Sequence, residues 1–268
     1  MSKRRLDTLL ADRGLFPSRT RAAASVMAGE VHLGTGRRTA AKPGELVDDD
    51  ELIDVDEKPA YVSRGGIKLA NALDASGLSV TGRTAIDVGA STGGFTDCLL
   101  QRGAAAVIAV DVGYGTLDYQ LREDARVTVM ERTNARTLGS AMLPPGPAVD
   151  LATVDVSFIS LTKVLPALLG CMAPHYDVLA MIKPQFEVGR GRVGKGGVVR
   201  DASERRTALV SVGECAIESG AGVVAYHSSG LPGPKGNRES FIWLVEPSRE
   251  GSTTDRAVLP DLAREVEP

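Results

Sequence analysis

The chain has 268 residues, of which 43% are hydrophobic, and its formal net charge is −3. This length and composition predict one large and one small domain with packed cores, and exclude a uniformly basic protein that binds polyanions over its whole surface. Three cysteines and three histidines form no metal-ligand spacing, so we expect no metal site and reduced thiols in the cytoplasm. The longest uncharged run, residues 219–234, is only 16 residues long. Because a membrane span needs about 20 apolar residues, we expect no span, and the polar start predicts no signal segment.

Residues 1–57 are predicted to form a small α+β domain. The leucines of residues 6–10 share one face of a helix that ends before Gly14. Ser18 is suited to cap a second helix, because its hydroxyl can accept from a backbone N–H of the first turn. The inward-facing residues predicted for this second helix are Ala22, Val26 and Met27. Residues 31–33 and 52–55 read as short strands.

The small domain concentrates basic residues. Residues 1–43 hold nine Lys or Arg against three acids, gathered at the chain start, the second helix start and the turn near residue 37. With the leucines of the first helix and the strand at 31–33, this pattern resembles the alpha-L RNA-binding fold, named after a small-subunit ribosomal protein. The resemblance implies RNA contacts by Arg4, Arg5, Arg19, Arg21 and Arg37. The alternative is a solvated basic face without a ligand.

Beyond a linker at residues 58–62, residues 63–247 alternate between strand and helix patterns. The predicted strands are 84–88, 106–111, 127–131, 149–154, 177–182, 222–227 and 240–245. Helices are predicted at 94–102, 161–170 and 204–219, among others. Such alternation predicts an α/β fold with a parallel sheet covered on both faces. The last two strands have no helix between them and are expected to form a hairpin at an antiparallel edge. Residues 248–268 are predicted to be a polar, mobile tail.

A glycine-rich turn follows the first strand of this large domain. Asp87 ends the strand, glycines follow at 89, 93 and 94, and an apolar helix pattern begins at Phe95. Glycines let a ligand approach backbone N–H groups at a helix start. The order resembles the S-adenosylmethionine (SAM) loop of class I methyltransferases, which have a Rossmann-like sheet. A turn without a ligand is the alternative. The residues assigned to cofactor binding are Asp87, Gly89, Ala90, Ser91, Thr92, Gly93, Gly94, Phe95, Asp111 and Asn134.

Asp111 and Asn134 belong to that set because of their places in the sheet. Each follows a predicted strand, and ligands of open α/β sheets bind beyond the carboxyl ends of the strands. The Asp111 carboxylate can accept from both hydroxyls of a bound ribose. Asn134 is the candidate for contact with the adenine edge.

Four charged residues form the candidate catalytic set. Lys68 is predicted at a helix start, Asp155 and Lys183 end the fourth and fifth strands, and Glu239 precedes the last strand. Pro184 keeps Lys183 extended at the strand tip. The alternative for Lys183 is a strand-end lysine whose stem packs on apolar neighbours. The order Lys, Asp, Lys, Glu resembles the tetrad of FtsJ-type ribose 2′-O-methyltransferases.

Seven segments in order resemble the TlyA family within that group: residues 63–69, 87–95, 111–115, 131–134, 156–160, 182–187 and 231–234. The resemblance implies 2′-O-methylation of cytidine in the ribosomal RNA of one or both ribosomal subunits. Local charge adds a second expectation, since basic residues near the mouth of the site, including the glycine-rich loop 188–197, are suited to track phosphates. The residues assigned to this role are Arg64, Arg132, Arg136, Arg190, Arg192 and Lys195.

The residue types of the tetrad fit methyl transfer to a hydroxyl. A ribose hydroxyl is a poor nucleophile until its proton is removed, and a lysine can remove it only as the free amine. We expect Lys183 to be the base or to position the hydroxyl, with Lys68, Asp155 and Glu239 in support. Aligning hydroxyl and methyl can contribute about 7–11 kcal/mol in ideal cases.

Three alternatives remain open at the level of sequence. An RNA base methyltransferase would also bind SAM, and residues 155–158 have the spacing of its amine-methylating motif without the two prolines. A hemolysin or membrane-active protein is a second alternative, because the TlyA family also carries that name. A non-catalytic RNA-binding factor is a third. The four tetrad residues favour the ribose enzyme.

Overall fold

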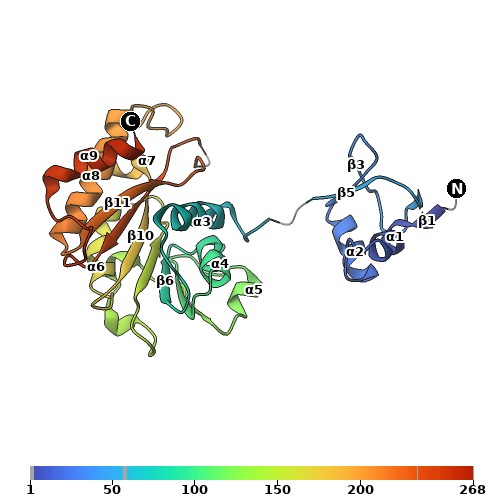
Figure 1. Ribbon diagram of the computed structural model, residues 1–268, viewed down its shortest axis with the longest axis horizontal. Helices are drawn as coiled ribbons and strands as arrows, with labels where there is room; N and C mark the ends of the chain where they lie inside the picture. Colours follow the sequence, from blue (N-terminus) through green and yellow to red (C-terminus); the bar gives the residue numbers. More distant parts are fainter. Residues whose placement is uncertain (1–2, 57–58, 234, 268) are drawn as a thin grey trace. The chain divides into compact units, whose positions relative to one another are not determined.

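The computed structural model divides into two compact units, Met1–Pro59 and Ala60–Pro268, and it describes residues 3–56, 59–233 and 235–267 (Figure 1). Lys58, placed in the predicted linker, lies outside these residues, as does the side chain of Arg190. Within the described residues, none of the helices combines the length and the apolar character needed to cross a bilayer.

The smaller unit contains two helices and two small sheets. Its elements are β1 (Lys3–Arg5), α1 (Leu6–Asp12), α2 (Arg19–Met27), β2 (Val31–Leu33), β3 (Arg38–Thr39), β4 (Leu46–Asp48) and β5 (Ile53–Val55). β1 pairs with β4, and β2 lies between β3 and β5. The predicted cap is confirmed, since the Ser18 hydroxyl accepts from the Arg21 N–H. Met27 was predicted to face inward, which is wrong: it ends α2 and is exposed.

The larger unit is built on a seven-stranded sheet in the order β11–β12–β10–β9–β6–β7–β8. Its strands are β6 (Thr84–Val88), β7 (Ala106–Val110), β8 (Val127–Met130), β9 (Leu151–Val154), β10 (Asp177–Ile182), β11 (Gly222–Ser228) and β12 (Ser240–Val245). Its α-helices are α3 (Arg64–Ser76), α4 (Gly94–Gln101), α5 (Tyr119–Arg122), α6 (Leu165–Leu169), α7 (Pro184–Glu187), α8 (Ala202–Glu218) and α9 (Leu259–Val266). The predicted α/β class is confirmed.

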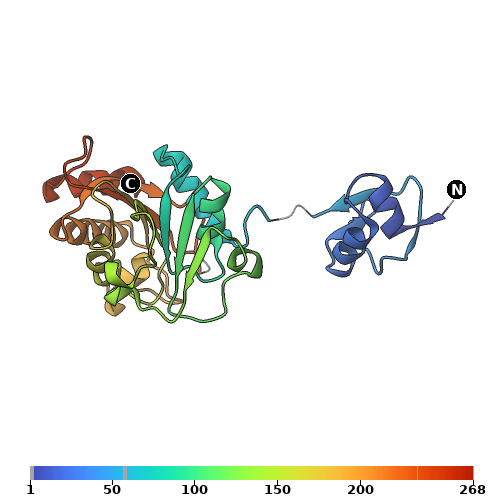
Figure 2. The same cartoon turned by 90° about the horizontal axis from the view of Figure 1, so that it is seen from below.

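Helices cover both faces of the sheet (Figure 2). Alternating side chains of the strands supply two hydrophobic cores, one on each face. Ile86 and Val88 of β6 pack with apolar residues of α6, α8 and α9. Ala85 packs on the opposite face with α3 and α4. Because both faces are covered, the strands read as continuous apolar runs, which is why their positions could be predicted from the sequence.

The antiparallel strand lies inside the sheet and not at its edge. β11 and β12 pair antiparallel, as the predicted hairpin requires, but β12 also pairs antiparallel with β10. β12 therefore sits between β10 and β11, and β11 forms the edge. This arrangement places Glu239, the residue before β12, beside the carboxyl end of β10.

The end of the chain is a packed helix, which corrects the prediction of a mobile tail. Leu259 and Ala263 of α9 are fully buried in the core that α8 and the sheet share. Leu262 and Val266 pack against that core as well. These four residues recur at helical spacing, so burial of one face holds the helix in place despite its polar composition.

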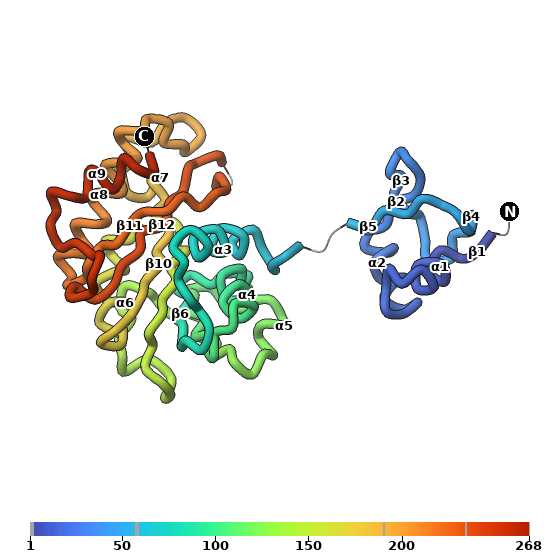
Figure 3. The backbone as a smooth tube through the Cα atoms, in the orientation of Figure 1, coloured from blue at the N-terminus to red at the C-terminus, as the bar shows by residue number. Residues whose placement is uncertain are grey.

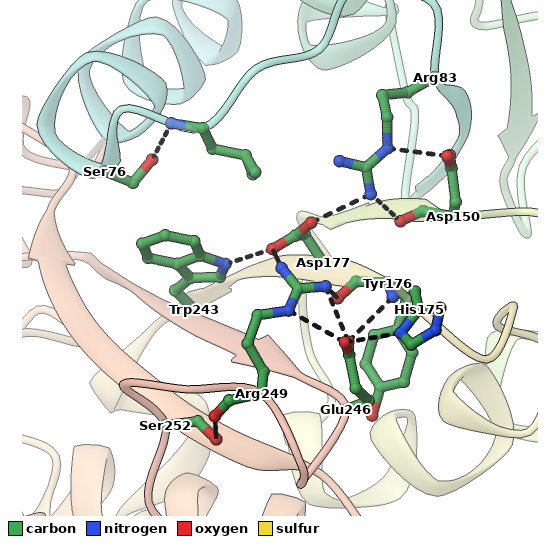
Figure 4. Close-up of polar contacts among 11 residues, drawn as sticks. Ser76, Arg83, Asp150, His175, Tyr176, Asp177, Trp243, Glu246, Arg249 and Ser252 are labelled. Atoms are coloured by element: carbon green, nitrogen blue, oxygen red, sulfur yellow. Dashed lines mark hydrogen bonds and ion pairs between the residues drawn. The ribbon is translucent and has the colours of Figure 1, made fainter.

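A network of charged side chains closes the amino ends of the strands (Figure 4). Asp177, the first residue of β10, lies at the centre of this network and is 2% exposed. Its carboxylate accepts from Arg83 at 3.0 Å, from Arg249 at 2.9 Å and from the Trp243 indole at 2.9 Å. Arg249 also donates to Glu246 at 2.8 Å. The network joins β10 and β12 to the segment that leads into β6.

Candidate active site

The four residues predicted to form a tetrad come together beyond the carboxyl ends of the strands. The Lys183 ammonium lies 2.6 Å from an Asp155 carboxylate oxygen, and Lys68 forms an ion pair with Glu239. Lys68, Lys183 and Glu239 are buried, at 7%, 9% and 3% exposure. Two lysines and two acids thus form adjacent ion pairs, which keeps the buried charges compensated.

Local sequence explains how each lysine reaches the site. Ser63 caps α3 by accepting from the Gly65 N–H, and Lys68 projects from the second turn of that helix. Pro184 occupies the first turn of α7, so Lys183 ends β10 in an extended conformation. Lys183 also donates to the Ser157 hydroxyl at 2.8 Å. Its ammonium is therefore held by two neighbours from the segment after β9.

Three cavities meet at Asp155. The tetrad cavity, of about 460 Å³, is lined by all four tetrad residues. The loop cavity, of about 420 Å³, is lined by residues 63–65, 68, 89–92, 94–95 and 155. The strand-end cavity, also about 420 Å³, lies along residues 110–112 and 133–136. Asp155 lines all three, and Lys68 lines the first two. The tetrad therefore lies where the loop cavity and the strand-end cavity adjoin the tetrad cavity.

The glycine-rich turn shapes the loop cavity as the sequence predicts. Gly89 has φ of +89°, and a Cβ there would lie 2.7 Å from the Asp155 carbonyl oxygen. Gly93, at φ +97°, precedes the first residue of α4. Only glycine adopts such angles at no steric cost. The turn can therefore bring backbone N–H groups close to a ligand while lying directly against the chain at Asp155.

Asp87 lies beneath this turn and outside all three cavity linings. It is fully buried, and its carboxylate accepts from the Thr96 hydroxyl at 2.7 Å and the Thr153 hydroxyl at 3.2 Å. Burial raises the pKa of Asp87 to about 7. Its position indicates that Asp87 braces the loop from below, whereas the sequence suggested direct contact with a ligand.

Asp111 and Asn134 line the strand-end cavity together. The Asp111 carboxylate accepts from the Ser91 N–H at 2.8 Å and the Gly113 N–H at 2.6 Å, which ties the glycine-rich turn to the end of β7. The Asn134 side-chain carbonyl accepts from the Arg136 N–H at 3.0 Å. Among the described residues, the Asn134 side-chain NH₂ has no hydrogen-bond partner.

The comparisons with known proteins agree with this geometry. Residues 61–246 match the family model described as FtsJ-like methyltransferase. The chain belongs to the FtsJ-like methyltransferases. It is 48% identical, over 95% of its length and 92% of the relative's, to the 16S/23S rRNA (cytidine-2′-O)-methyltransferase TlyA of Mycobacterium tuberculosis. It is 40% identical, over 90% of its length and 99% of the relative's, to Hemolysin A of Brachyspira hyodysenteriae. The resemblance inferred from the motifs is confirmed.

A solved structure agrees over the whole chain of this FtsJ-like methyltransferase. A proposed hemolysin from Streptococcus thermophilus superposes with a TM-score of 0.72 at 40% identity, covering 99% of this chain and 96% of that one. The hemolysin name therefore occurs on proteins of the same fold.

Sequence reasoning missed part of the lining of the tetrad cavity. Ser157, Gln185 and Asn237 line it, and none was proposed as a site residue. Phe158, weighed only under the base-methylating alternative, is 92% exposed with φ of +65°, and its ring centroid lies 5.4 Å from that of Phe186. The signal available for Ser157 and Phe158 was their place directly after the strand that ends at Asp155.

The basic residues of the larger unit lie in different settings. Arg136 lines the strand-end cavity, and Arg64 lines the loop cavity while donating to a backbone carbonyl at 2.9 Å. Arg132 stacks over the Tyr114 ring, 4.4 Å from its centroid. Arg192 pairs with an acid of α8 at 3.2 Å. Lys195 is exposed. Arg64 and Arg136 are thus the ones that border the cavities.

Four of the five arginines named in the smaller unit have acidic neighbours. Arg4 pairs with Asp49 at 3.2 Å and with Asp12. Arg5 lies 2.7 Å from Asp7, and Arg19 lies 3.6 Å from the same carboxylate. Arg37 pairs with two further acids, Asp54 and Asp56. In the part of the chain that the structure describes, Arg21 is exposed and has no ion-pair partner, so it is the cation of this set most available to a polyanion.

Proposed function

We propose that this FtsJ-like methyltransferase transfers the methyl group of SAM to the ribose 2′-hydroxyl of a cytidine in ribosomal RNA. The observation that carries the proposal is the meeting of three cavities at Asp155, with Lys183 paired to it at 2.6 Å. The loop and strand-end cavities would take the cofactor, and the tetrad cavity would take the acceptor nucleotide.

The residues around the two cofactor cavities fit SAM. Asp111 already accepts two backbone N–H bonds, but a carboxylate has about four acceptor positions and can still accept from both ribose hydroxyls. Asn134 has a free amide NH₂ for an acceptor on the adenine edge. Residues 89–95 would hold the amino-acid part of the cofactor, because Gly89 leaves no Cβ in the way.

Bound SAM supplies an electrophilic methyl group on a sulfonium. Lys183 would orient the acceptor hydroxyl and, in molecules where it has released its own proton to solvent, take the hydroxyl proton as the free amine. Asp155 and Ser157 fix the Lys183 side chain, and the Lys68–Glu239 pair closes the adjoining wall. Because these side chains are held in place before the substrate arrives, alignment costs little at the moment of reaction.

The substrate class follows from the relatives and from the smaller unit. The TlyA relative named above is an rRNA cytidine-2′-O-methyltransferase. The smaller unit would dock on structured rRNA, and the enzyme would work in the cytoplasm on ribosomal subunits. Arg21, Arg64 and Arg136 are the cations that we expect to meet phosphates.

Calorimetry tests the cofactor site. Asp111→Ala should weaken SAM binding by about tenfold or more, since a hydrogen bond to a charged group contributes about 1.5–3 kcal/mol. Asp124→Ala, at a half-buried acid paired with Arg126 at 2.8 Å and outside the cavity linings, is the matched control and should bind SAM like the parent. Equal SAM affinity in all three proteins would contradict this placement.

Methyl transfer to purified ribosomal subunits tests the substrate. The protein should label rRNA, and nuclease mapping should place the methyl group on cytidine ribose. The same mapping identifies which subunit is modified. Label found only on bases would contradict the proposal.

A further inference from the structure

The loop between β11 and β12, residues 229–239, carries Glu239 and is fastened to α3 on one side. Arg64 and Asn71 of α3 each donate to a backbone carbonyl of this loop at 2.9 Å. Lys68, which lies between them on the same helix face, pairs with Glu239. The tetrad pair is therefore one of three contacts that hold this loop against α3.

Asn237 fastens the loop on its other side. It is 3% exposed, and its side-chain carbonyl accepts from the Val199 N–H at 2.9 Å. Its side-chain NH₂ donates to the Gly197 carbonyl at 2.8 Å. One amide thus joins the loop to the glycine-rich basic segment 189–201. Asn237 and Gly197 both line the tetrad cavity.

The same residue also closes the turn that surrounds Glu239. The Asn237 backbone carbonyl accepts from the Gly233 N–H at 2.9 Å. A Cβ at Gly233 would lie 2.3 Å from a Glu239 carboxylate oxygen, so the turn is packed directly on that carboxylate. Movement of Asn237 would therefore disturb both the wall of the tetrad cavity and the surroundings of Glu239.

A buried ion pair from the C-terminal helix supports the basic segment. Arg205 of α8 donates to the Arg200 carbonyl at 2.7 Å and to the Glu267 carboxylate at 2.8 Å. Glu267, which directly follows α9, is 3% exposed. Figure 3 shows α9 running alongside α8 toward the end of the chain. Arg205 also donates to the Val199 carbonyl at 3.3 Å. Through Arg205, the end of the chain therefore supports one of the residues to which Asn237 is bonded.

We propose that Asn237 is a positioning residue of the active site and that the Arg205–Glu267 pair supports it, so that the C-terminal helix belongs to the working site. The inference rests on the proposed function. Asn237 would fix the position of Glu239 and of the wall of the tetrad cavity, where the acceptor nucleotide would bind. It would not touch the transferred methyl group. Among the described residues, neither cofactor cavity is lined by Gly197 or by the segments 233 and 235–239, so binding of SAM should be independent of Asn237.

The test uses the full chain and compares Asn237→Ala with the parent. Turnover at saturating RNA and SAM should fall at least about tenfold, since a small misplacement in an active site is costly. SAM affinity by calorimetry should not change. Hydrogen exchange of the Val199 amide should become faster, because its acceptor is removed. Glu267→Gln should act in the same direction with a smaller loss.

The matched control lies on the same helix. Arg264 and Asp261 of α9 form an exposed ion pair, and Arg264→Ala should leave turnover and Val199 exchange at parent values. Should Asn237→Ala fail to fold, Asn237→Asp serves instead: it keeps the acceptor for Val199 but loses the donor to Gly197, so turnover should still fall.

Two results separate this inference from the proposed function. Parent-like turnover in the Asn237 variant, with faster Val199 exchange, would overturn the positioning role while the methyltransferase assignment stands. Absence of transfer by the parent protein would refute the proposed function, whatever the exchange data show about the loop.

Discussion

The two ends of the seven-stranded sheet both bury charged side chains, but in different surroundings. At the amino ends, Asp177 accepts from two arginines and an indole, and Glu246 accepts from Arg249. At the carboxyl ends, two lysine–acid pairs border three cavities that meet at Asp155. The same residue types therefore hold strands together at one end and face open space at the other.

Structural and catalytic charges in this molecule differ in what surrounds them. A buried ion pair is by itself weak evidence of function, because structural ion-pair networks bury charged groups as well. Lys183 differs because it and its partners, Asp155 and Ser157, line the tetrad cavity. The Asp177 carboxylate instead accepts from Arg83, Arg249 and Trp243. Substitution at the carboxyl ends should therefore lower activity with little effect on stability. Substitution at the amino ends should lower stability with little effect on cofactor binding.

The largest expected effect is at the carboxyl end. Lys183→Ala should lower methyl transfer by at least about a hundredfold, the usual range for loss of a general acid or base. SAM and RNA binding should persist, and the melting temperature should change little. Lys163→Ala, at an exposed lysine, is the control. Transfer within a few-fold of the parent would place Lys183 with the structural charges.

The next effect is at the amino end. Asp177→Ala should lower the free energy of unfolding by about 3–5 kcal/mol, because it leaves the partners of a buried charge unpaired. SAM affinity per folded molecule should stay at the parent value below the unfolding transition. Denaturant titration and calorimetry measure the two quantities. A large loss of SAM affinity without loss of stability would contradict the structural role of Asp177.

A smaller effect concerns Asp87, a buried acid whose described donors are threonine hydroxyls and not cations. Burial raises the pKa of this carboxyl from 3.8 to about 7, so the folded chain holds a proton between those values that the unfolded chain releases. The contribution of protonated Asp87 to the free energy of unfolding is fully present below the unfolded pKa. It is lost as pH rises through about 7.

Asp87→Asn should therefore match the parent near pH 4. It should become more stable than the parent by up to about 4 kcal/mol at pH 8, the free energy that corresponds to the rise of this pKa from 3.8 to about 7. Denaturant titrations at both pH values measure this difference. A constant difference across that range would show that Asp87 does not titrate as its burial implies.

The smallest effect concerns an exposed cation of the smaller unit. Arg21→Ala should weaken binding to rRNA and reduce the slope of log affinity against log salt by about 0.7–0.9, as expected for one lost phosphate contact. Arg256→Ala removes an exposed arginine that pairs with Glu218 at 3.0 Å and should leave the slope unchanged. Equal slopes for both variants would assign Arg21 to a solvated face.

Much of the sheet could be predicted because buried strands leave a strong pattern. The strands 84–88, 177–182 and 240–245 have the predicted bounds, since each is an apolar run with a sharp end. The grouping of Asp155 and Lys183 followed from the same pattern, because parallel strands end at one edge of the sheet.

Other features left no local pattern. α9 was missed because it is only eight residues long and its apolar residues are few among polar neighbours, although they recur at helical spacing. The bonds from Asn237 to Val199 and Gly197 join loop residues about 40 positions apart, and no periodicity records such contacts. Asp87 was assigned to the ligand because a strand-end acid usually faces the crevice, whereas Thr96 and Thr153 turn it inward.

The most direct test of the central claim is an rRNA substrate with a single 2′-deoxy nucleotide at the mapped position. If Lys183 and its partners serve a ribose hydroxyl, this substrate should bind like the parent RNA and accept no methyl group at that nucleotide. A base methyltransferase would still modify it, because the acceptor atom on the base is intact. A methylated base recovered from the deoxy nucleotide would contradict the account.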